Sequence, residues 1–548
     1  MSKPMRLRAL RSASSLLRSA FCLPALLTAA LLAAGCAVPL GPGFRLRARQ
    51  MVLGDTPAQL MASPLLGIEP SAPVRVRVAD RIENTGNRPL DYLDITLPAA
   101  IAASGSNLTI RIDGRTVPLA AASEAPGAPL RLRFDPPWPR RQAREVVLEY
   151  NLATDPVRGG VAAATPDVFY LADPLALPFW LTPAGFFANG DVLSRDERFE
   201  LSLPADFRIA ASGRQQRRRS PDGTFLYRFR TDGREFPSFV IAGRYQEQIV
   251  VTPSRNVVFW TFQPLDPEVA RMAAERLANT WVIFARLFGP LPGLAPLRVV
   301  ETPAGVATVD VSDRDFLIAA FPQGLLLGSR AFAQGIAGEP VLRAAEAAMV
   351  RIWFGWRVPL RPDMENLLGS GLELFAAALA AEARGGPQAR HAEIARLLAD
   401  YDRARVPGRL PGEEGSPLRP PSESTPQQRV AGALKSALFL AALDDLAGQD
   451  NFERAVRRLQ DAMAGRGLSL SLDDLRSSLE STAGTALADV FRLWLNRPGV
   501  PDDFRARYSQ SAAAASGAPS IAAGRNSTRG SGLPRRLRAG IRGSGLQP

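Results

Sequence analysis

Histidine is almost absent from this sequence: His391 is the single histidine among 548 residues. A metal site that requires two imidazoles therefore cannot be built from this chain alone. A Ser-His-Asp triad would have to use His391, which lies in a polar stretch of helical character at 388–393, a setting typical of a surface histidine. Ser370 lies outside any Gly-x-Ser-x-Gly motif, and no Walker loop or dinucleotide fingerprint is present. These absences argue against the enzyme chemistries that short motifs most often indicate.

Cysteine is nearly as scarce, and its two positions indicate an export signal. Residues 1–35 contain five cations and no acid, and their apolar run at 21–34 is too short to span a bilayer comfortably. Leu-Ala-Ala-Gly-Cys at 32–36 resembles the lipobox of bacterial lipoproteins, although Ala33 stands where leucine is more usual. We expect Cys36 to be lipidated; since Cys22 lies within the signal, the mature chain then has no internal disulfide. The alternative is an ordinary signal or a membrane anchor with a chance cysteine.

Long hydrophobic runs are also missing beyond this signal, so we expect no further membrane span. Ala37 follows Cys36 in place of the aspartate that often retains bacterial lipoproteins in the inner membrane. We therefore expect a lipid-anchored protein of the bacterial cell envelope, on the periplasmic face of the outer membrane, with residues 36–69 as a linker.

Acidic residues are absent from both ends of the chain, which explains much of the formal net charge of +13. Residues 509–548 carry six arginines, and removing these and the five cations of residues 1–35 leaves about +2 for residues 36–508. The high pI is therefore no sign of nucleic-acid binding, and no nucleic-acid partner is expected. We expect the tail at 509–548 to be disordered and solvated, with weak attraction to anionic lipid as the alternative.

Hydrophobic periodicity divides the body of the chain in two. Alternation with period two predicts strands at 74–78, 108–112, 130–134, 145–150, 198–203 and 225–229, which favours a sandwich or a saddle-shaped sheet. From Pro267 the period becomes helical, with Leu277, Trp281 and Phe284 on one face. A short strand is expected at 297–300, and mainly helices from 331 to 495, interrupted by a Pro/Gly/Ser-rich loop at about 406–428.

Five groups of segments, in order along the chain, resemble parts of the M1 (gluzincin) family of zinc aminopeptidases. They are 81–84 with 93–98, 203–204 with 211–213 and 236–243, 284–292 with 298–303, Trp-Phe-Gly at 353–355, and 448–452 with 491–495 and 499–501. The resemblance covers about residues 70–505. It implies an α+β multidomain fold, with a β-sandwich or saddle domain at 70–250 and a mainly α, thermolysin-like domain at 251–508.

The family's zinc site is His-Glu-x-x-His on a helix that runs on into Trp-Phe-Gly, with a further glutamate ligand later in the chain. Residues i and i+4 project from one helix face, so two imidazoles share the metal, and the glutamate between them is the general base. Alignment on 353–355 puts Ala347, Ala348 and Arg351 at the His, Glu and His positions and Ser370 at the last ligand. The tyrosine of the family's Tyr-x-x-Gly, which would stabilise an oxyanion, is matched by Arg429.

No change of register restores this site, because one histidine cannot supply two imidazoles. Glu346 lies two residues before the position of the family's base and would still lack both of them. Met-Glu-Asn at 364–366 resembles the end of the family's substrate-binding motif but follows the zinc helix, so we interpret Glu365 as a solvated helix residue. Asp444 and Asp445 are adjacent on an expected helix and diverge, which indicates a solvated face.

The resemblance thus implies a peptidase fold without its catalytic residues, and we expect no enzymatic activity, no metal and no cofactor. Arg351 and Arg429 would both point towards the cleft between the two domains, where two guanidinium groups would receive a carboxylate of a peptide or protein ligand, such as a peptide C-terminus. The alternative is that they only fill space or pair with nearby acids. A hydrolase with a non-standard site and an envelope assembly factor are the other functional hypotheses.

Overall fold

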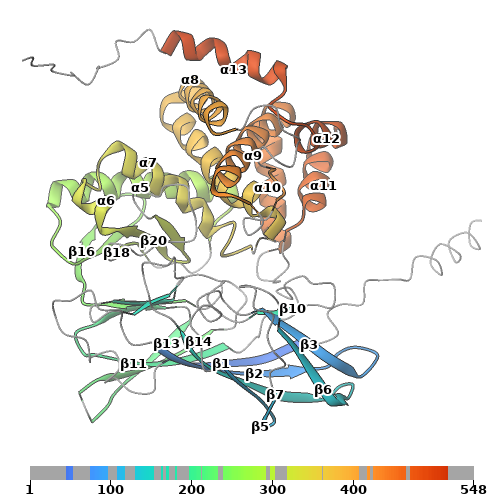
Figure 1. The fold of residues 1–548 in the computed structure, drawn as a ribbon. Coiled ribbons are helices and arrows are strands. Elements are labelled where there is room, and N and C mark those ends of the chain that lie inside the picture. The colour runs from blue at the N-terminus through green and yellow to red at the C-terminus, as the bar shows by residue number, and fades with distance from the viewer. Residues whose placement is uncertain are drawn as a thin grey trace, which may run out of the picture.

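The two halves expected from periodicity are stacked one above the other in the computed structural model, with the β-rich half below and the mainly helical half above (Figure 1). The structure describes residues 45–53, 74–96, 108–117, 130–152, 162–164, 168–171, 179–181, 197–211, 213–221, 223–231, 239–291, 296–302, 318–358, 360, 362–405, 416–419, 424–463 and 470–515. Cys22, Cys36 and the expected signal at 1–35 lie outside the described residues, and their roles stay predictions.

The largest sheet of the lower half has eight strands. In spatial order these are β13 (Arg214–Arg219), β14 (Phe225–Thr231), β11 (Glu197–Leu203), β1 (Arg45–Leu53), β2 (Val74–Glu83), β7 (Ala143–Leu152), β4 (Thr109–Ile112) and β5 (Arg115–Thr116). β2, β4, β7, β11 and β14 begin within two residues of predicted positions, whereas β1 and β13 were not predicted. Alternate residues such as Val78, Leu148 and Phe199 are buried on the inner face of the sheet, as the period of two requires.

Two smaller sheets supply the other side of this core. One consists of β10 (Phe179–Leu181), β3 (Leu90–Thr96) and β6 (Leu130–Trp138), and the other of β12 (Arg208–Ala211), β15 (Val240–Gly243), β9 (Val168–Leu171) and β8 (Ala162–Ala164). Ile95 and Leu132 from the first and Val240 from the second belong to one hydrophobic cluster with the inner face of the large sheet. The predicted β-sandwich is therefore confirmed.

The domain boundaries need two corrections. The segment 36–69, expected to be a linker, contains β1, which pairs with β2 on one side and in parallel with β11 on the other. The expected boundary at 250/251 divides a hairpin, because β16 (Gln246–Val250) pairs with β17 (Val257–Thr261) and both belong to the sheet of the second half. The β-rich part therefore starts before residue 70, and the peptidase-like part starts at β16.

That second sheet has five strands in the order β16, β17, β18 (Leu297–Thr302), β20 (Gly324–Gly328) and β19 (Ala319–Phe321). Gly324 pairs with Arg298, and a Cβ atom at this glycine would lie 1.8 Å from the Arg298 carbonyl oxygen, so a side chain would not fit. Three helices accompany this sheet (Figure 1): α5 (Pro267–Phe288), α6 (Ser329–Ala333) and α7 (Glu339–Met349).

The rest of the chain is helical, as predicted. After a 3-10 turn at Val350–Ile352, another at Pro362–Met364 and a π-helical segment at Glu365–Gly371 come α8 (Leu372–Ala404), α9 (Pro426–Ala447), α10 (Gln449–Met463), α11 (Leu472–Ala483), α12 (Ala488–Asn496) and α13 (Asp502–Ala515). Capping boxes formed by Thr425 with Gln428 and by Ser471 with Asp474 begin α9 and α11.

Helix α13 corrects the expected start of the disordered tail, because it continues past residue 509 to Ala515. Tyr508 and Phe504 anchor the helix in the hydrophobic core, and the alanine run that follows favours helix. Among the described residues, no helix is both long and apolar enough to cross a membrane.

Candidate functional site

Helix α7 carries the first two positions that the alignment singled out. Ala347 and Ala348 are 5% and 0% exposed and pack within the core of the peptidase-like half. The helix then tightens into the 3-10 turn at Val350–Ile352, which carries Arg351. Trp353, the residue that follows this turn, is fully buried and donates a 2.8 Å hydrogen bond from its indole to the carbonyl of Gly289. This anchor fixes the orientation of the turn and so the direction of Arg351.

Arg351 points inward and is held by two glutamates. Its Nη1 lies 2.5 Å from Glu365 Oε1 and its Nε lies 3.3 Å from Glu373 Oε2. The Arg351 side chain is 9% exposed and that of Glu373 only 2% exposed. Charge-assisted hydrogen bonds of this kind compensate the desolvation of buried ions. Arg351 therefore pairs with acids inside the chain, which corrects the expectation that it is available to a ligand's carboxylate.

The glutamates reach Arg351 because of the helix that follows. Glu365, Gly369 and Glu373 follow each other at intervals of four residues, across the π-helical segment and the start of α8. A Cβ atom at Gly369 would lie 2.4 Å from Arg351 Nη1, so the missing side chain leaves room for the guanidinium against the helix backbone. Glu365 is thus an ion-pair partner at 25% exposure and not the solvated residue that we expected. Ser370 is half-buried and follows Gly369 by one residue.

Glu346, on the preceding turn of α7, forms a second buried ionic cluster. It is 1% exposed and accepts hydrogen bonds from Arg276 at 2.9 and 3.0 Å, from Arg384 at 2.6 Å and from Thr280 at 2.7 Å. The hydrogen bonds of Glu339 and Glu346 raise the pKa of Arg276, and Arg276 in turn lowers the pKa of Glu339. A carboxylate held by two guanidinium groups and a hydroxyl is a structural counter-ion rather than a proton acceptor.

Asp444 and Asp445 are not solvated, contrary to expectation, because Arg390 on α8 binds both of them. Arg390 Nη2 lies 2.7 Å from Asp444 and 3.0 Å from Asp445, and Tyr508 on α13 donates a 2.8 Å hydrogen bond to Asp445. Burial raises the pKa of Asp444 to about 6, against the opposing effect of Arg390. His391 packs its ring against Tyr508 at 4.5 Å between centroids, so the single histidine belongs to this junction of three helices.

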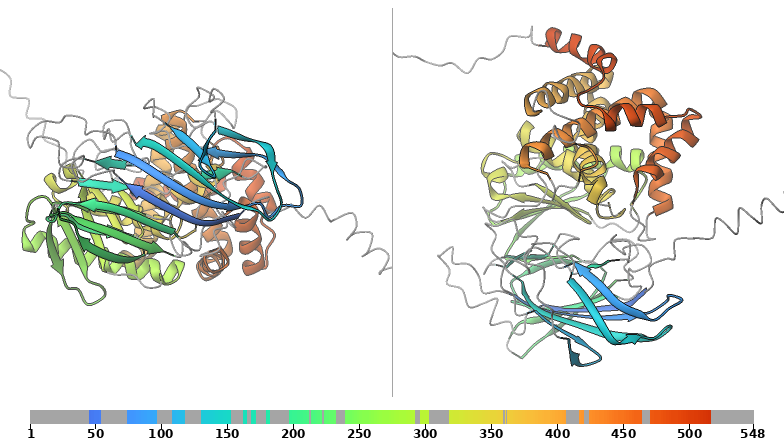
Figure 2. Two further views of the ribbon diagram at one scale, coloured as in Figure 1. Left: turned by 90° about the horizontal axis from the view of Figure 1, so that it is seen from below. Right: turned by 45° about the vertical axis from the view of Figure 1, so that its right-hand side comes forward.

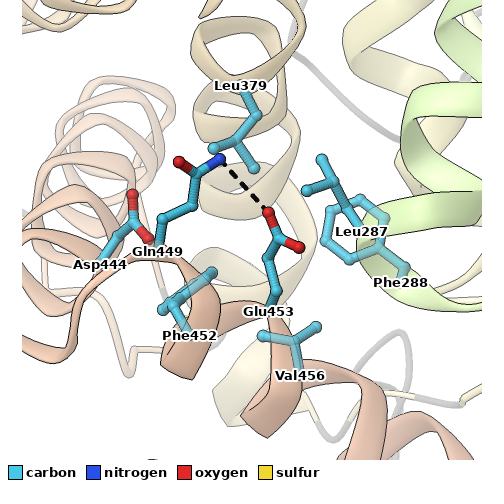
Figure 3. A pocket seen from close by; sticks show the side chains of 8 residues that line it. All are labelled: Leu287, Phe288, Leu379, Asp444, Gln449, Phe452, Glu453 and Val456. Carbon is cyan, nitrogen blue, oxygen red and sulfur yellow. Dashed lines mark hydrogen bonds between the residues drawn. The ribbon is translucent and has the colours of Figure 1, made fainter. Parts of the chain in front are cut away.

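A small pocket beside Asp444 is lined by residues of α5, α8, α9 and α10 (Figure 3). In it Gln449 donates a 3.3 Å hydrogen bond to Glu453, while Phe288, Leu379 and Phe452 supply apolar walls. Its volume of about 10 Å³ is close to the space that one water molecule needs. The pocket is too small for a peptide, and Arg351 is not among its lining residues.

Solved structures with a similar arrangement of elements include an M1 zinc metallopeptidase, an aminopeptidase and an LTA4 hydrolase. An M1 zinc metallopeptidase from Deinococcus radiodurans matches with a TM-score of 0.56 and 17% identity, over 84% of this chain and 96% of that one. The Legionella pneumophila aminopeptidase A, solved in complex with aspartic acid, matches with a TM-score of 0.59 and 14% identity, over 84% of this chain and 50% of its own. Yeast LTA4 hydrolase matches with a TM-score of 0.57 and 12% identity, over 84% and 69%. This chain has the M1 peptidase fold.

The sequence itself matches no protein-family model and no curated protein. The M1 fold is therefore confirmed by structure, at identities that establish the fold alone. The expected two-domain architecture, β-rich and then mainly helical, agrees with this match over 84% of the chain.

The Deinococcus neighbour with this fold is a zinc metallopeptidase, and the residues that our sequence alignment assigns to a zinc site do not fit the metal. Ala347 and Ala348 have no lone pair to offer, and the guanidinium of Arg351 keeps its protons and its positive charge. Glu365 and Glu373 already bind that guanidinium. Across the described part of the chain, no group of three or more histidine, cysteine or acidic side chains is arranged to hold a metal ion.

Arg429, the second expected ligand contact, lies in the first turn of α9 and is half-buried. Further along the same helix, Gly432 and Ser436 lie against Asn366 and Gly371 of the π-helical segment. The structure thus brings the helix of Arg429 against the segment that holds Arg351. Sequence reasoning missed Glu373 altogether; its spacing of eight residues from Glu365, with a glycine midway, was the available signal.

Proposed function

We propose that this protein is a non-catalytic member of the M1-fold group, held at the bacterial envelope through a lipidated Cys36, and that it binds a peptide or protein segment without hydrolysing it. The observation that supports this most directly is the ion-paired Arg351. A buried cation with two carboxylate partners stands where the resemblance places a zinc ligand. Both carboxylates bind the guanidinium, so neither is left as an open metal ligand.

The surrounding residues favour the same conclusion. Hydrolysis of a peptide bond requires a polarised water and a group that accepts its proton. The resemblance assigns Ala348 to the position of the family's general base, and Glu346 nearby is already bound by two arginines and a threonine. His391, the other candidate base, packs on Tyr508.

Arg429 is the residue that we propose for ligand contact. It is half-buried in the first turn of α9, a turn that contains no acidic residue. A carboxylate bound there would gain both a guanidinium partner and the favourable end of the helix dipole. The C-terminus of a peptide is the ligand group that fits this chemistry.

The first experiment measures the zinc content of the purified protein and its hydrolysis of aminopeptidase substrates on the same sample. We expect no stoichiometric zinc and no hydrolysis. One zinc per chain together with peptide cleavage would contradict the proposal and would favour a hydrolase with a non-standard site.

Peptide binding has its own test, by fluorescence anisotropy with a peptide library in free-acid and amidated forms. We expect Arg429→Gln to weaken the binding of free-acid peptides at least about tenfold, since a hydrogen bond to a charged group is lost. The matched control is Arg454→Gln, which removes one exposed arginine from α10. Equal affinity for free-acid and amidated peptides would exclude the role of Arg429 while leaving the lack of catalysis untouched.

The anchor is tested by Cys36→Ser. We expect this variant to lose the lipid modification and its co-fractionation with outer membranes. Unchanged fractionation would show that another part of the chain carries the association.

A further inference from the structure

The eight-stranded sheet has a second face, which points away from the helical half of the molecule (Figure 2, left). The strand register defines its residues, because directly paired residues share a face. Arg214 pairs with Arg230, which pairs with Arg198. Following the register through β1, β2, β7 and β4 leads to Arg111, which lies on the same face near the opposite edge of the sheet. We call the whole surface the outer sheet face.

Arginine dominates this face. Nine arginines whose exposure the structure describes lie on it, and all of them are exposed: Arg75, Arg77, Arg81, Arg111, Arg198, Arg214, Arg218, Arg228 and Arg230. The register adds Arg45, which pairs with Glu83. The same register places only four acids there, namely Glu83, Glu145, Glu149 and Glu200. The face therefore has a net charge of at least +5, which is nine minus four without Arg45. Residues 36–508 as a whole have only about +2, so the remainder of the body is net negative and the positive charge is concentrated here.

The ion pairs on the face leave this excess in place. Glu149 lies 3.5 to 3.6 Å from each of Arg75, Arg77 and Arg111, so one carboxylate is shared by three guanidinium groups. Glu200 pairs with Arg228 at 3.1 Å. Arginine side chains bind phosphate oxygens in a two-pronged geometry and are less strongly hydrated than lysine, which suits them to a layer of phosphate groups.

The position of β1 gives a second reason to expect this face close to the membrane. This strand is the fourth of eight in the sheet, and it begins at Arg45, nine residues after Cys36. Nine extended residues reach at most about 30 Å. If Cys36 is lipidated, as the proposed function holds, the bilayer and this sheet stay within that distance of each other. The charge argument does not depend on lipidation; only this tether argument rests on the proposed function.

We infer that the outer sheet face is a docking surface for an anionic lipid bilayer, so that the sheet lies against the headgroups and the helical half points away from them. Each cationic residue near an anionic surface strengthens partitioning by roughly fivefold, through attraction that is screened by salt. The interaction is peripheral and electrostatic, and it adds to an anchor without replacing it.

The test is co-sedimentation of the full chain with phosphatidylcholine vesicles and with vesicles that also contain phosphatidylglycerol. Binding to the neutral vesicles measures the charge-independent contribution of the N-terminal apolar segment, and the increment on adding anionic lipid measures electrostatic docking. The sheet variant combines Arg111→Gln, Arg214→Gln and Arg218→Gln. It removes three exposed cations, one near one edge of the outer sheet face and two at the other edge. The expected result is a loss of roughly ten- to one-hundred-fold in that increment.

The matched control is Arg454→Gln, Arg458→Gln and Arg497→Gln, which makes the same change of charge at exposed positions of the helical half. Its increment should stay within about twofold of the unmodified chain, because a cation beyond about one Debye length from the surface contributes little. Thermal melts of both variants show whether they are folded. Equal losses in the two variants, or no loss in the sheet variant, would overturn the inference and would leave the face for an acidic protein partner. Vesicle binding is independent of zinc, hydrolysis and peptide affinity, so its failure is distinguishable from that of the proposed function.

Discussion

Removal of the buried cation is the sharpest test of how the peptidase-like half is held together. Arg351→Met replaces the guanidinium with an apolar side chain of similar length and leaves Glu365 and Glu373 facing each other across the former ion pair. We expect the variant to be strongly destabilised, because Glu373 is 2% exposed and cannot recover its hydration.

The magnitude follows from the geometry. Removing one partner of a buried ion pair typically costs about 3–5 kcal/mol, since the remaining charge is left buried without a counter-ion. Two carboxylates share Arg351, so the upper part of that range is expected. Replacing all three charges together, as Arg351→Met with Glu365→Leu and Glu373→Leu, should recover most of the loss and fall within about 2 kcal/mol of the unmodified protein.

The assay is urea denaturation followed by the circular-dichroism signal of the helices, which report on the peptidase-like half. The control is Arg492→Met, which breaks a pair between Arg492 and Asp489, 69% and 88% exposed, and should cost no more than about 0.5 kcal/mol. A cost below about 1 kcal/mol for Arg351→Met would refute the reasoning, and so would a triple variant as unstable as the single one.

Three further predictions concern other contacts of this half. Gly371→Ala should cost about 1–3 kcal/mol in urea unfolding, because its Cβ would lie 2.4 Å from the Ser436 Cβ on α9; an unchanged midpoint would mean that the two helices separate freely. Glu346→Gln should lower the free energy of unfolding by about 3 kcal/mol, since two arginines lose a buried counter-charge; no effect would contradict the counter-ion role. Asp444 has a folded-state pKa of about 6, above its ordinary value, so the folded protein binds the proton more tightly and stability falls as the pH rises from about 4 to about 6. Asp444→Asn should remove up to about 3 kcal/mol of this decline, and parallel pH profiles for the two proteins would refute it.

The sequence allowed the strands to be predicted where the signal is local. Alternation in β2, β7 and β11 depends only on neighbouring residues, and each strand was found. β1 was missed because its place depends on partners far along the chain: Arg49 pairs with Glu197 and also with Asp80. A segment that we expected to be a linker thus forms a central strand, because β2 and β11 both pair with it.

The candidate site divides in the same way. Ala347, Ala348 and Arg351 were assigned to the family's site positions by counting from Trp-Phe-Gly at 353–355, and this assignment stays a prediction. The environment of Arg351 was not foreseeable, since it depends on a π-helical segment that turns Glu365 inward. The expectation for Asp444 and Asp445 was wrong for a similar reason. Their partner Arg390 lies on another helix, and the local sequence pattern does not predict this contact.

The position of β1 also has a consequence for the order of folding. This strand leaves the ribosome early, and its antiparallel neighbour β2 follows soon after, whereas its parallel neighbour β11 is made much later. Until β11 arrives, one edge of β1 is open to pairing with any other unfinished chain, a known route to aggregation. The sequence of β1 carries arginine at 45, 47 and 49, and positive charge on an open strand edge discourages such pairing. The arginines of β1 therefore protect this central strand from pairing with other chains until β11 has been synthesised.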